Sequence, residues 1–192
     1  SFNNDVDFLS QHVKTFVLSD SGGKAKVAVV PGYQGRVMTS TDGVSGLSYG
    51  WINRELIGSG KLNPHINAFG GEDRFWLGPE GGQFSIFFKN GDPFDLPHWQ
   101  TPAPIDSIGY NLVKRTPSMA VFAKSFQLEN YMGNHLDVSV ERTVRLLDAA
   151  AIGKNLGIAL PKGVNGVGYE SVNKVTNGGK NAWTEDAGML SI

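Results

Sequence analysis

The sequence predicts an all-β domain of antiparallel strands, and three observations support this fold class. The 192 residues include 25 glycines and 9 prolines, a content typical of many short strands joined by turns. Several stretches alternate apolar with polar residues, most clearly HLDVSVERTVRLLD at 135–148. Glycine and proline interrupt nearly every sustained helical pattern. The length fits one domain that spans residues 1–192.

The first quarter of the chain predicts a helix and a three-stranded meander. DVDFLSQHV at 5–13 predicts a short helix with Asp5 as its N-cap. KTFVLSD at 14–20, AKVAVVP at 25–31 and GRVMTSTD at 35–42 each alternate β-branched or apolar residues with polar ones. Each stretch is followed by turn residues, so we expect consecutive strands to pair.

The rest of the chain predicts further strands and one long ordered loop. Strands are expected at 83–89, 118–130 and 135–148, and another before the turn at 177–179. The segment NGDPFDLPHWQTPAP contains four prolines and is too poor in backbone donors for a central strand. On the strand at 135–148, we expect Glu141, Arg142 and Arg145 to form a solvent-side charge ladder or a cross-strand pair.

The end of the sequence predicts an open sheet. AGMLSI at 187–192 has the composition of a strand that begins and has no polar finish. We therefore expect that the domain continues beyond Ile192 or that a partner completes the sheet.

Composition excludes several classes of partner, structure and site. The formal net charge is −1 and charged residues make up 18% of the chain, so nucleic acid is not an expected partner. No apolar run approaches the roughly 20 residues of a membrane-spanning helix. The chain has no cysteine, which excludes a disulfide framework, a thiolate nucleophile and a cysteine-based zinc site.

Three stretches carry a resemblance to a known family: NAFGGEDRFWLGPEGGQFSIFF at 67–88, LPHWQTPAPID at 96–106 and LDVSVERTVRLLD at 136–148. They resemble uncharacterised bacterial proteins, most like those of gut Bacteroidetes, that have the galactose mutarotase-like fold. The resemblance implies an antiparallel β-supersandwich with a concave face that receives sugars, of which 1–192 would be the N-terminal portion. It also implies an extracytoplasmic location, in the periplasm or at the cell surface, and a signal peptide outside this sequence.

The sequence departs from the active members of that fold, the aldose 1-epimerases. They use a histidine in a Leu-His-Gly-Gly corner, whereas here Phe69 precedes Gly70 and Gly71. No His-x-x-Phe-Asn-Leu segment is present. The residues that would bind a sugar or transfer a proton are therefore expected elsewhere in the sequence.

The stretch FGGEDRFWLGPEGG at 69–82 is the first candidate, because it places aromatic and charged side chains among glycines. In a sugar site, Trp76 would stack on a pyranose ring, Glu72 and Asp73 would accept hydrogen bonds from hydroxyls, and Arg74 would donate one. Strand alternation directs Arg74 and Trp76 to the cleft, and Phe75 with Leu77 to the core. The alternative is that the aromatics are core residues and the charges pair with one another.

The second candidate is the proline-rich loop, in which His98 is a predicted acid or base and Trp99, like Trp76, is predicted to contact the sugar. A loop histidine with a pKa near 6.5 can act as a general acid or base, and Glu80 is its predicted catalytic partner. The alternative is an exposed histidine beside a tryptophan that fills the core. We predict no metal and no cofactor, because the loop around Asp92 and Asp95 lacks the spacing of a calcium loop.

Three functions remain open from the sequence. The first is a carbohydrate-active enzyme, epimerase-like or otherwise, in which Glu80 and His98 are the acid/base pair. The second is a non-catalytic sugar-binding module, and the third is a structural domain of a larger carbohydrate-processing protein. All three rest on the resemblance, because a fold does not by itself determine a function.

Overall fold

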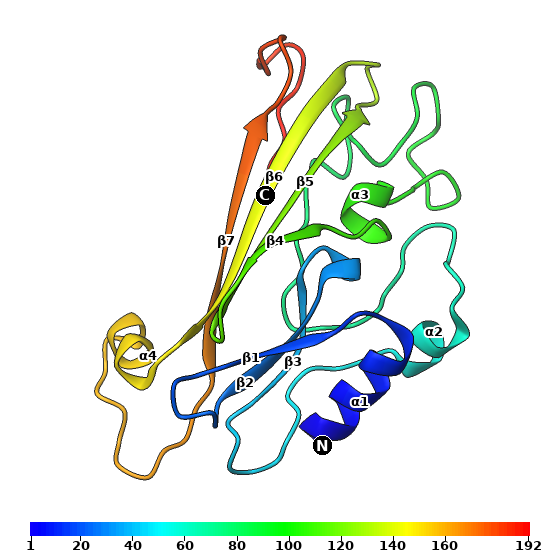
Figure 1. The fold of residues 1–192 in the computed structure, drawn as a ribbon. Coiled ribbons are helices and arrows are strands. Elements are labelled where there is room, and N and C mark those ends of the chain that lie inside the picture. The colour runs from blue at the N-terminus through cyan, green and yellow to red at the C-terminus, as the bar shows by residue number, and fades with distance from the viewer.

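The computed structural model describes all residues from Ser1 to Ile192, and its strands form two antiparallel sheets (Figure 1). The first sheet has the order β1-β2-β3, with β1 at Phe16–Ser19, β2 at Lys26–Val30 and β3 at Arg36–Thr41. This is the meander predicted from the sequence. The chain is mainly β, which confirms the antiparallel all-β prediction.

The second sheet has the order β4-β5-β6-β7 and contains the longest strands. Its members are β4 at Asn111–Arg115, β5 at Met119–Glu129, β6 at His135–Leu147 and β7 at Gly168–Asn177. β6 alternates buried and more exposed residues along its whole length, as its sequence predicts. In Figure 1 these strands rise along the molecule beyond the first sheet.

The helices are short, and the longest has 11 residues. They are α1 at Phe2–His12, α2 at Arg54–Ser59, α3 at Ala103–Asp106 and α4 at Ala149–Leu156, with a 3-10 turn at Pro31–Tyr33. The predicted N-terminal helix is confirmed, but its cap is Ser1, whose hydroxyl accepts a hydrogen bond from the backbone of Asn4, and not Asp5. No helix of the structure has the length and apolar character to cross a membrane.

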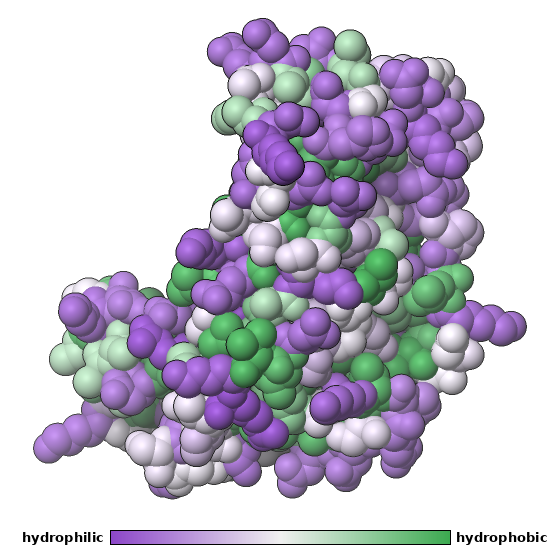
Figure 2. Space-filling model, turned by 45° about the horizontal axis from the view of Figure 1, so that its top comes forward, coloured by the Kyte–Doolittle hydropathy of each residue, from purple (hydrophilic) through white to green (hydrophobic).

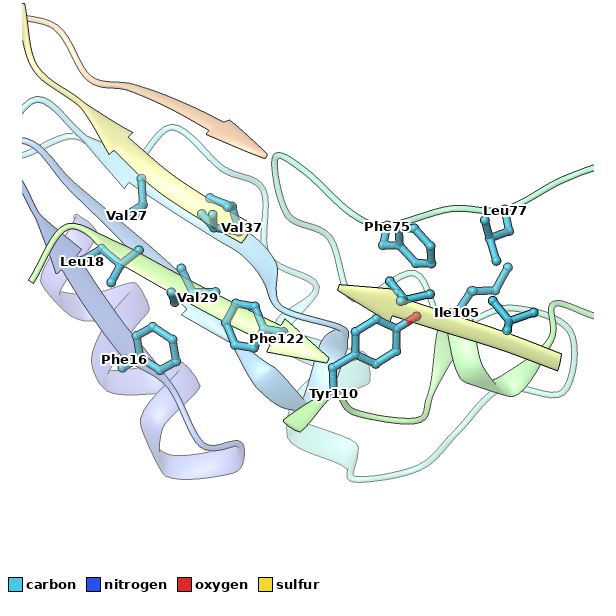
Figure 3. Close-up of a cluster of buried hydrophobic side chains, with 14 of the residues drawn as sticks. Phe16, Leu18, Val27, Val29, Val37, Phe75, Leu77, Ile105, Tyr110 and Phe122 are labelled. Atoms are coloured by element: carbon cyan, nitrogen blue, oxygen red, sulfur yellow. The ribbon is translucent and has the colours of Figure 1, made fainter. Parts of the chain in front are cut away.

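The main hydrophobic core lies between the two sheets (Figure 3). The first sheet contributes Leu18, Val27 and Val29, and the second contributes Phe122 and Val140, all essentially without exposed surface. The segment between the sheets adds further side chains to this core: Phe75, Leu77, Ile86, Phe87, Ile105 and Tyr110. The prediction that Phe75 and Leu77 are core residues is confirmed.

A smaller core covers the other face of the first sheet. Ala28 and Val30 of β2 pack there with Leu9 of α1 and with Leu56 and Ile57 of α2. The first sheet is therefore sandwiched between helices and the second sheet.

Two predicted strands are wrong. The stretch 83–89 is irregular, because its backbone bonds to turn carbonyls: Ser85 donates to Gly82 at 3.0 Å and Ile86 donates to Pro79 at 3.1 Å. AGMLSI forms only an isolated bridge between Ser191 and Gly78. Gly188 has a φ of 89°, a conformation that ends regular pairing.

Candidate functional site

A polar cleft of about 880 Å³ lies between the proline-rich loop and the end of β5. Its volume is within the range of small-molecule sites. Hydrophilic residues dominate the upper part of the molecule, where this loop and the strand ends lie (Figure 2). The cleft is lined by Ile86, Phe87, Phe88, Lys89, Asn90, Asp92, Pro97, His98, Gln100, Thr101, Pro102, Glu129 and Asn130.

His98 lines the cleft and is held by Asp95. One carboxylate oxygen of Asp95 accepts hydrogen bonds from the His98 backbone at 3.2 Å and from Nδ1 at 2.5 Å. This bond raises the pKa of His98, with a smaller contribution from the charge of Asp92, and lowers the pKa of Asp95. Because Nδ1 is engaged, Nε2 is the ring nitrogen that is left to meet a ligand.

The loop that carries His98 is tied to the turn between β5 and β6. The side chain of Asn90 donates to the carbonyl of Tyr131 at 2.7 Å, and the Tyr131 hydroxyl donates to the carbonyl of Asp92 at 3.0 Å. Phe94 packs against Tyr131, with ring centroids 4.6 Å apart. These contacts fix the loop at several points, so the cleft is formed before any ligand arrives.

The opposite wall is fixed by a buried asparagine. Asn130 is 1% exposed, donates to the carbonyl of Ala187 at 2.8 Å and accepts from the backbone of Asn134 at 3.0 Å. Thr101 also lines the cleft, and its buried hydroxyl has no hydrogen-bond partner. Such a hydroxyl is costly to leave unpaired.

The two tryptophans predicted to bind sugar support the cleft from the core. The Phe87 ring, 1% exposed, stacks on Trp99 at 5.2 Å between centroids and contacts Trp76 at 5.4 Å. Trp76 and Trp99 are half-buried and pack against the main core, and neither lines the cleft. Their connection to the cleft therefore runs through Phe87.

The three charged residues of FGGEDRFW each bind a different part of the sandwich. Glu72 accepts from the Ser40 hydroxyl on β3 at 2.9 Å. Asp73 accepts from Arg142 on β6 at 2.5 Å. Arg74 donates to the carbonyl of Ile105 at 2.8 Å, and its guanidinium lies 4.1 Å from the centre of the Trp76 ring. None of the three lines the cleft.

Glu80 is paired with Trp76, whose indole nitrogen donates to its carboxylate at 2.7 Å. His98 lines the cleft and Glu80 does not. The structure therefore does not bring the predicted pair to one cavity wall, and their joint role in catalysis stays a prediction.

The sequence predicts Arg142 on the solvent side of β6, and that prediction is wrong. Its side chain has no exposed surface and donates to Asp73 and, at 2.8 Å, to the side chain of Asn173 on β7. The outer face of β6 carries the cross-strand pair as predicted, because Arg145 binds Glu170 there. Arg142 faces inward because side chains alternate between the two faces of a strand, and its even-numbered position lies on the same face as the buried apolar residues of β6.

A second buried arginine lies on β3. Arg36 is 1% exposed and donates to the carbonyl of Gly70 at 2.9 Å, while its Nε and Nη2 have no partner. Burial, together with the positive charge of Arg74, lowers the pKa of Arg36 to about 10.

A protein-family model matches the whole chain. The matching description is Family of unknown function (DUF6786), and the match spans residues 1–192. The chain belongs to DUF6786. No curated protein and no solved structure matches it.

In this DUF6786 chain, sequence reasoning missed most of the residues that form the cleft. Asn90, Gln100, Thr101 and Asn130 are neutral polar residues with no motif around them. The signal that was available is the loop itself: a proline-rich segment too long for a turn is where binding residues concentrate.

Proposed function

We propose that the cleft binds a carbohydrate. The observation that carries this proposal is the chemistry of the lining: the exposed amide side chains of Asn90 and Gln100 lie with the carboxylates of Asp92 and Glu129. Amides both donate and accept, and carboxylates accept, which matches a ligand whose surface consists of hydroxyl groups. The cleft volume of about 880 Å³ is sufficient for a small saccharide.

The charge balance of the cleft supports a neutral polar ligand. The lining contains two basic residues, Lys89 and His98, and two acidic residues, Asp92 and Glu129, so neither positive nor negative charge dominates it. The Phe88 side chain adds an apolar surface on which a sugar ring can lie. We further propose that the two sheets belong to a supersandwich of the galactose mutarotase type and that the protein acts outside the cytoplasm, as the resemblance implies.

The test is titration of the protein with a panel of mono- and disaccharides by calorimetry. Asp92→Ala is the informative variant, because its carboxylate lines the cleft while the loop contact uses its backbone carbonyl. We expect affinity to fall by about 10- to 100-fold, the effect of removing a charged hydrogen-bond partner. Asp7→Ala, at an exposed position of α1, is the matched control and should bind like the wild type. Absence of binding to every saccharide contradicts the proposal.

A catalytic role is the second candidate, and the Asp95–His98 pair is the observation that favours it. A histidine held through Nδ1 by a carboxylate is an oriented proton donor or acceptor at Nε2. If His98 acts alone in the cleft, His98→Gln should lower turnover by roughly 10²- to 10⁴-fold while Glu80→Gln leaves it unchanged. If Glu80 and His98 form the acid/base pair, both variants should lose turnover. Sugar binding without turnover by the wild type leaves the binding module as the function.

A further inference from the structure

The open edge of β7 is the most regular unpaired edge in the molecule. β7 pairs with β6 over ten residues, from Gly168 to Asn177, without a bulge, and it is the last strand of its sheet (Figure 1). It contains no proline. A long, regular edge with free backbone groups is able to pair with another strand.

The opposite edge of the same sheet is protected. β4 has five residues, its pairing with β5 is interrupted by a register shift, and it carries Lys114 and Arg115. Short length, a bulge and positive charges are the features by which proteins block strand addition. The contrast within one sheet singles out β7 as an interaction edge.

We propose that β7 pairs with β7 of a second copy of this chain, antiparallel and about a two-fold axis at Val172. A two-fold antiparallel pair places residues of the same sheet face opposite one another. Centred on Val172, it sets Glu170 opposite Lys174 of the second copy, twice. On the inner face it sets Tyr169 opposite Val175, both half-buried residues that pack against the core.

Charge complementarity extends beyond the two edge strands. Within one copy, Glu141 on β6 lies opposite Lys174 on β7, and Arg145 lies opposite Glu170. The proposed pairing therefore continues a row of alternating sign across four strands: Glu141, Lys174, then Glu170 and Arg145 of the second copy. Opposite charges in directly facing positions stabilise a sheet, and like charges destabilise it.

The neighbouring registers lack this match. An axis at Glu170 or at Lys174 sets like charges face to face. An axis at Ser171 or at Asn173 sets Val172 opposite Glu170 or opposite Lys174. Among these registers, only the axis at Val172 places an apolar pair at the centre and opposite charges on both sides. The pair would bury Val172, whose side chain is 56% exposed in the single chain.

The first test is the self-association of the 192-residue chain by sedimentation equilibrium at increasing concentration. One added strand pair is a small interface, so we expect a reversible dimer with Kd on the order of micromolar. Val172→Lys sets two lysines opposite each other at the axis and should weaken the dimer at least about tenfold. Val113→Lys, on the protected edge strand β4 at a position 64% exposed, is the matched control and should leave the dimer unchanged.

The second test fixes the register by cross-linking, since the chain has no cysteine. Val172→Cys brings two thiols face to face at the axis and should form a disulfide-linked dimer on mild oxidation. Thr176→Cys places its two thiols about 26 Å apart along the strands, at about 3.3 Å per residue, and should stay unlinked. A wild-type monomer at all concentrations, or equal cross-linking of both variants, overturns the proposal.

Discussion

Arg142, with no exposed surface, donates to the carboxylate of Asp73 at 2.5 Å, although the two residues are 69 positions apart in the chain. The contact joins the glycine-rich segment that follows Gly71 to the centre of the longest strand. It therefore ties the segment between the two sheets to the second sheet.

We expect Asp73→Ala to lower the free energy of unfolding by about 3–5 kcal/mol, because it leaves the Arg142 charge buried without its partner. The double variant Asp73→Ala/Arg142→Met should recover part of that loss. Urea denaturation measures both. Glu170→Ala, which breaks the exposed pair with Arg145, is the control and should cost less than about 1 kcal/mol. Equal losses in the two pairs would contradict a structural role for Arg142.

The glycine corner predicts a second stability effect. Gly70 has a φ of 90°, and a Cβ there would lie 2.3 Å from the carbonyl oxygen of Trp51. Gly70→Ala should therefore destabilise the protein by more than about 2 kcal/mol, through backbone strain and the clash together. A Cβ at Gly81 would have no neighbour within 4 Å, so Gly81→Ala should stay within about 0.5 kcal/mol of the wild type. Thermal unfolding of the two variants makes the comparison.

Trp99 should contribute to stability more than an exposed tryptophan does. Its ring stacks on the buried Phe87, so Trp99→Ala should lower the free energy of unfolding by roughly 2–4 kcal/mol. Trp51, 62% exposed, is the matched control, and Trp51→Ala should have an effect of about 0.5 kcal/mol or less. Loss of sugar affinity in Trp99→Ala without loss of stability would instead place Trp99 in direct contact with the ligand.

The His98 titration gives a test of the pair at the cleft. The pKa of His98 is higher in the folded protein than its value of about 6.5 in the unfolded chain. The stabilisation from the protonated His98 is therefore complete below about pH 6.5 and is lost as the pH rises through the pKa of the folded protein. The folded pKa of Asp95 is lowered, so the same interaction is lost as pH falls through that value. The pair therefore persists in the interval between these two folded values.

Nuclear magnetic resonance of the His98 ring should show a pKa above 6.5 in the wild type, and Asp95→Asn should move it down. Asp92→Asn should move it less, because Asp92 acts only through its charge and contributes least. A His98 pKa that does not respond to Asp95→Asn would mean that the hydrogen bond does not form in solution.

The sequence predicted the strands of this fold well where alternation and turns agreed. β1, β2, β3, β5 and β6 follow from period-two patterns bounded by glycine or polar turns. The stretch 83–89 has a similar composition and is not a strand, because the backbone N–H groups of Ser85 and Ile86 bond to the turn carbonyls of Gly82 and Pro79 and not to a neighbouring strand. Composition alone does not distinguish these two cases.

The candidate site was harder to predict, because its contacts join distant segments. The proline-rich loop identifies His98 as a candidate, but nothing in the local sequence indicates that Asp95 is its partner. The sequence predicts that Asp73 binds a sugar, whereas its partner is Arg142, which alternation along β6 places on the inner face with the apolar residues of that strand. Side-chain pairing across 69 positions is set by packing of the sheets, which local patterns do not encode.

The hydrogen bonds that build the cleft bear on the order in which the chain folds. Asn90 reaches Tyr131 across 41 positions, and Asn130 reaches Ala187 across 57. Such contacts close long loops, and the partner of Asn130 follows β7, so we expect them to form after the strands of the second sheet have assembled. We therefore expect the cleft to be the last region to form, so that ligand binding reports the completion of folding. We also expect amide hydrogen exchange to be faster in the proline-rich loop than in β6.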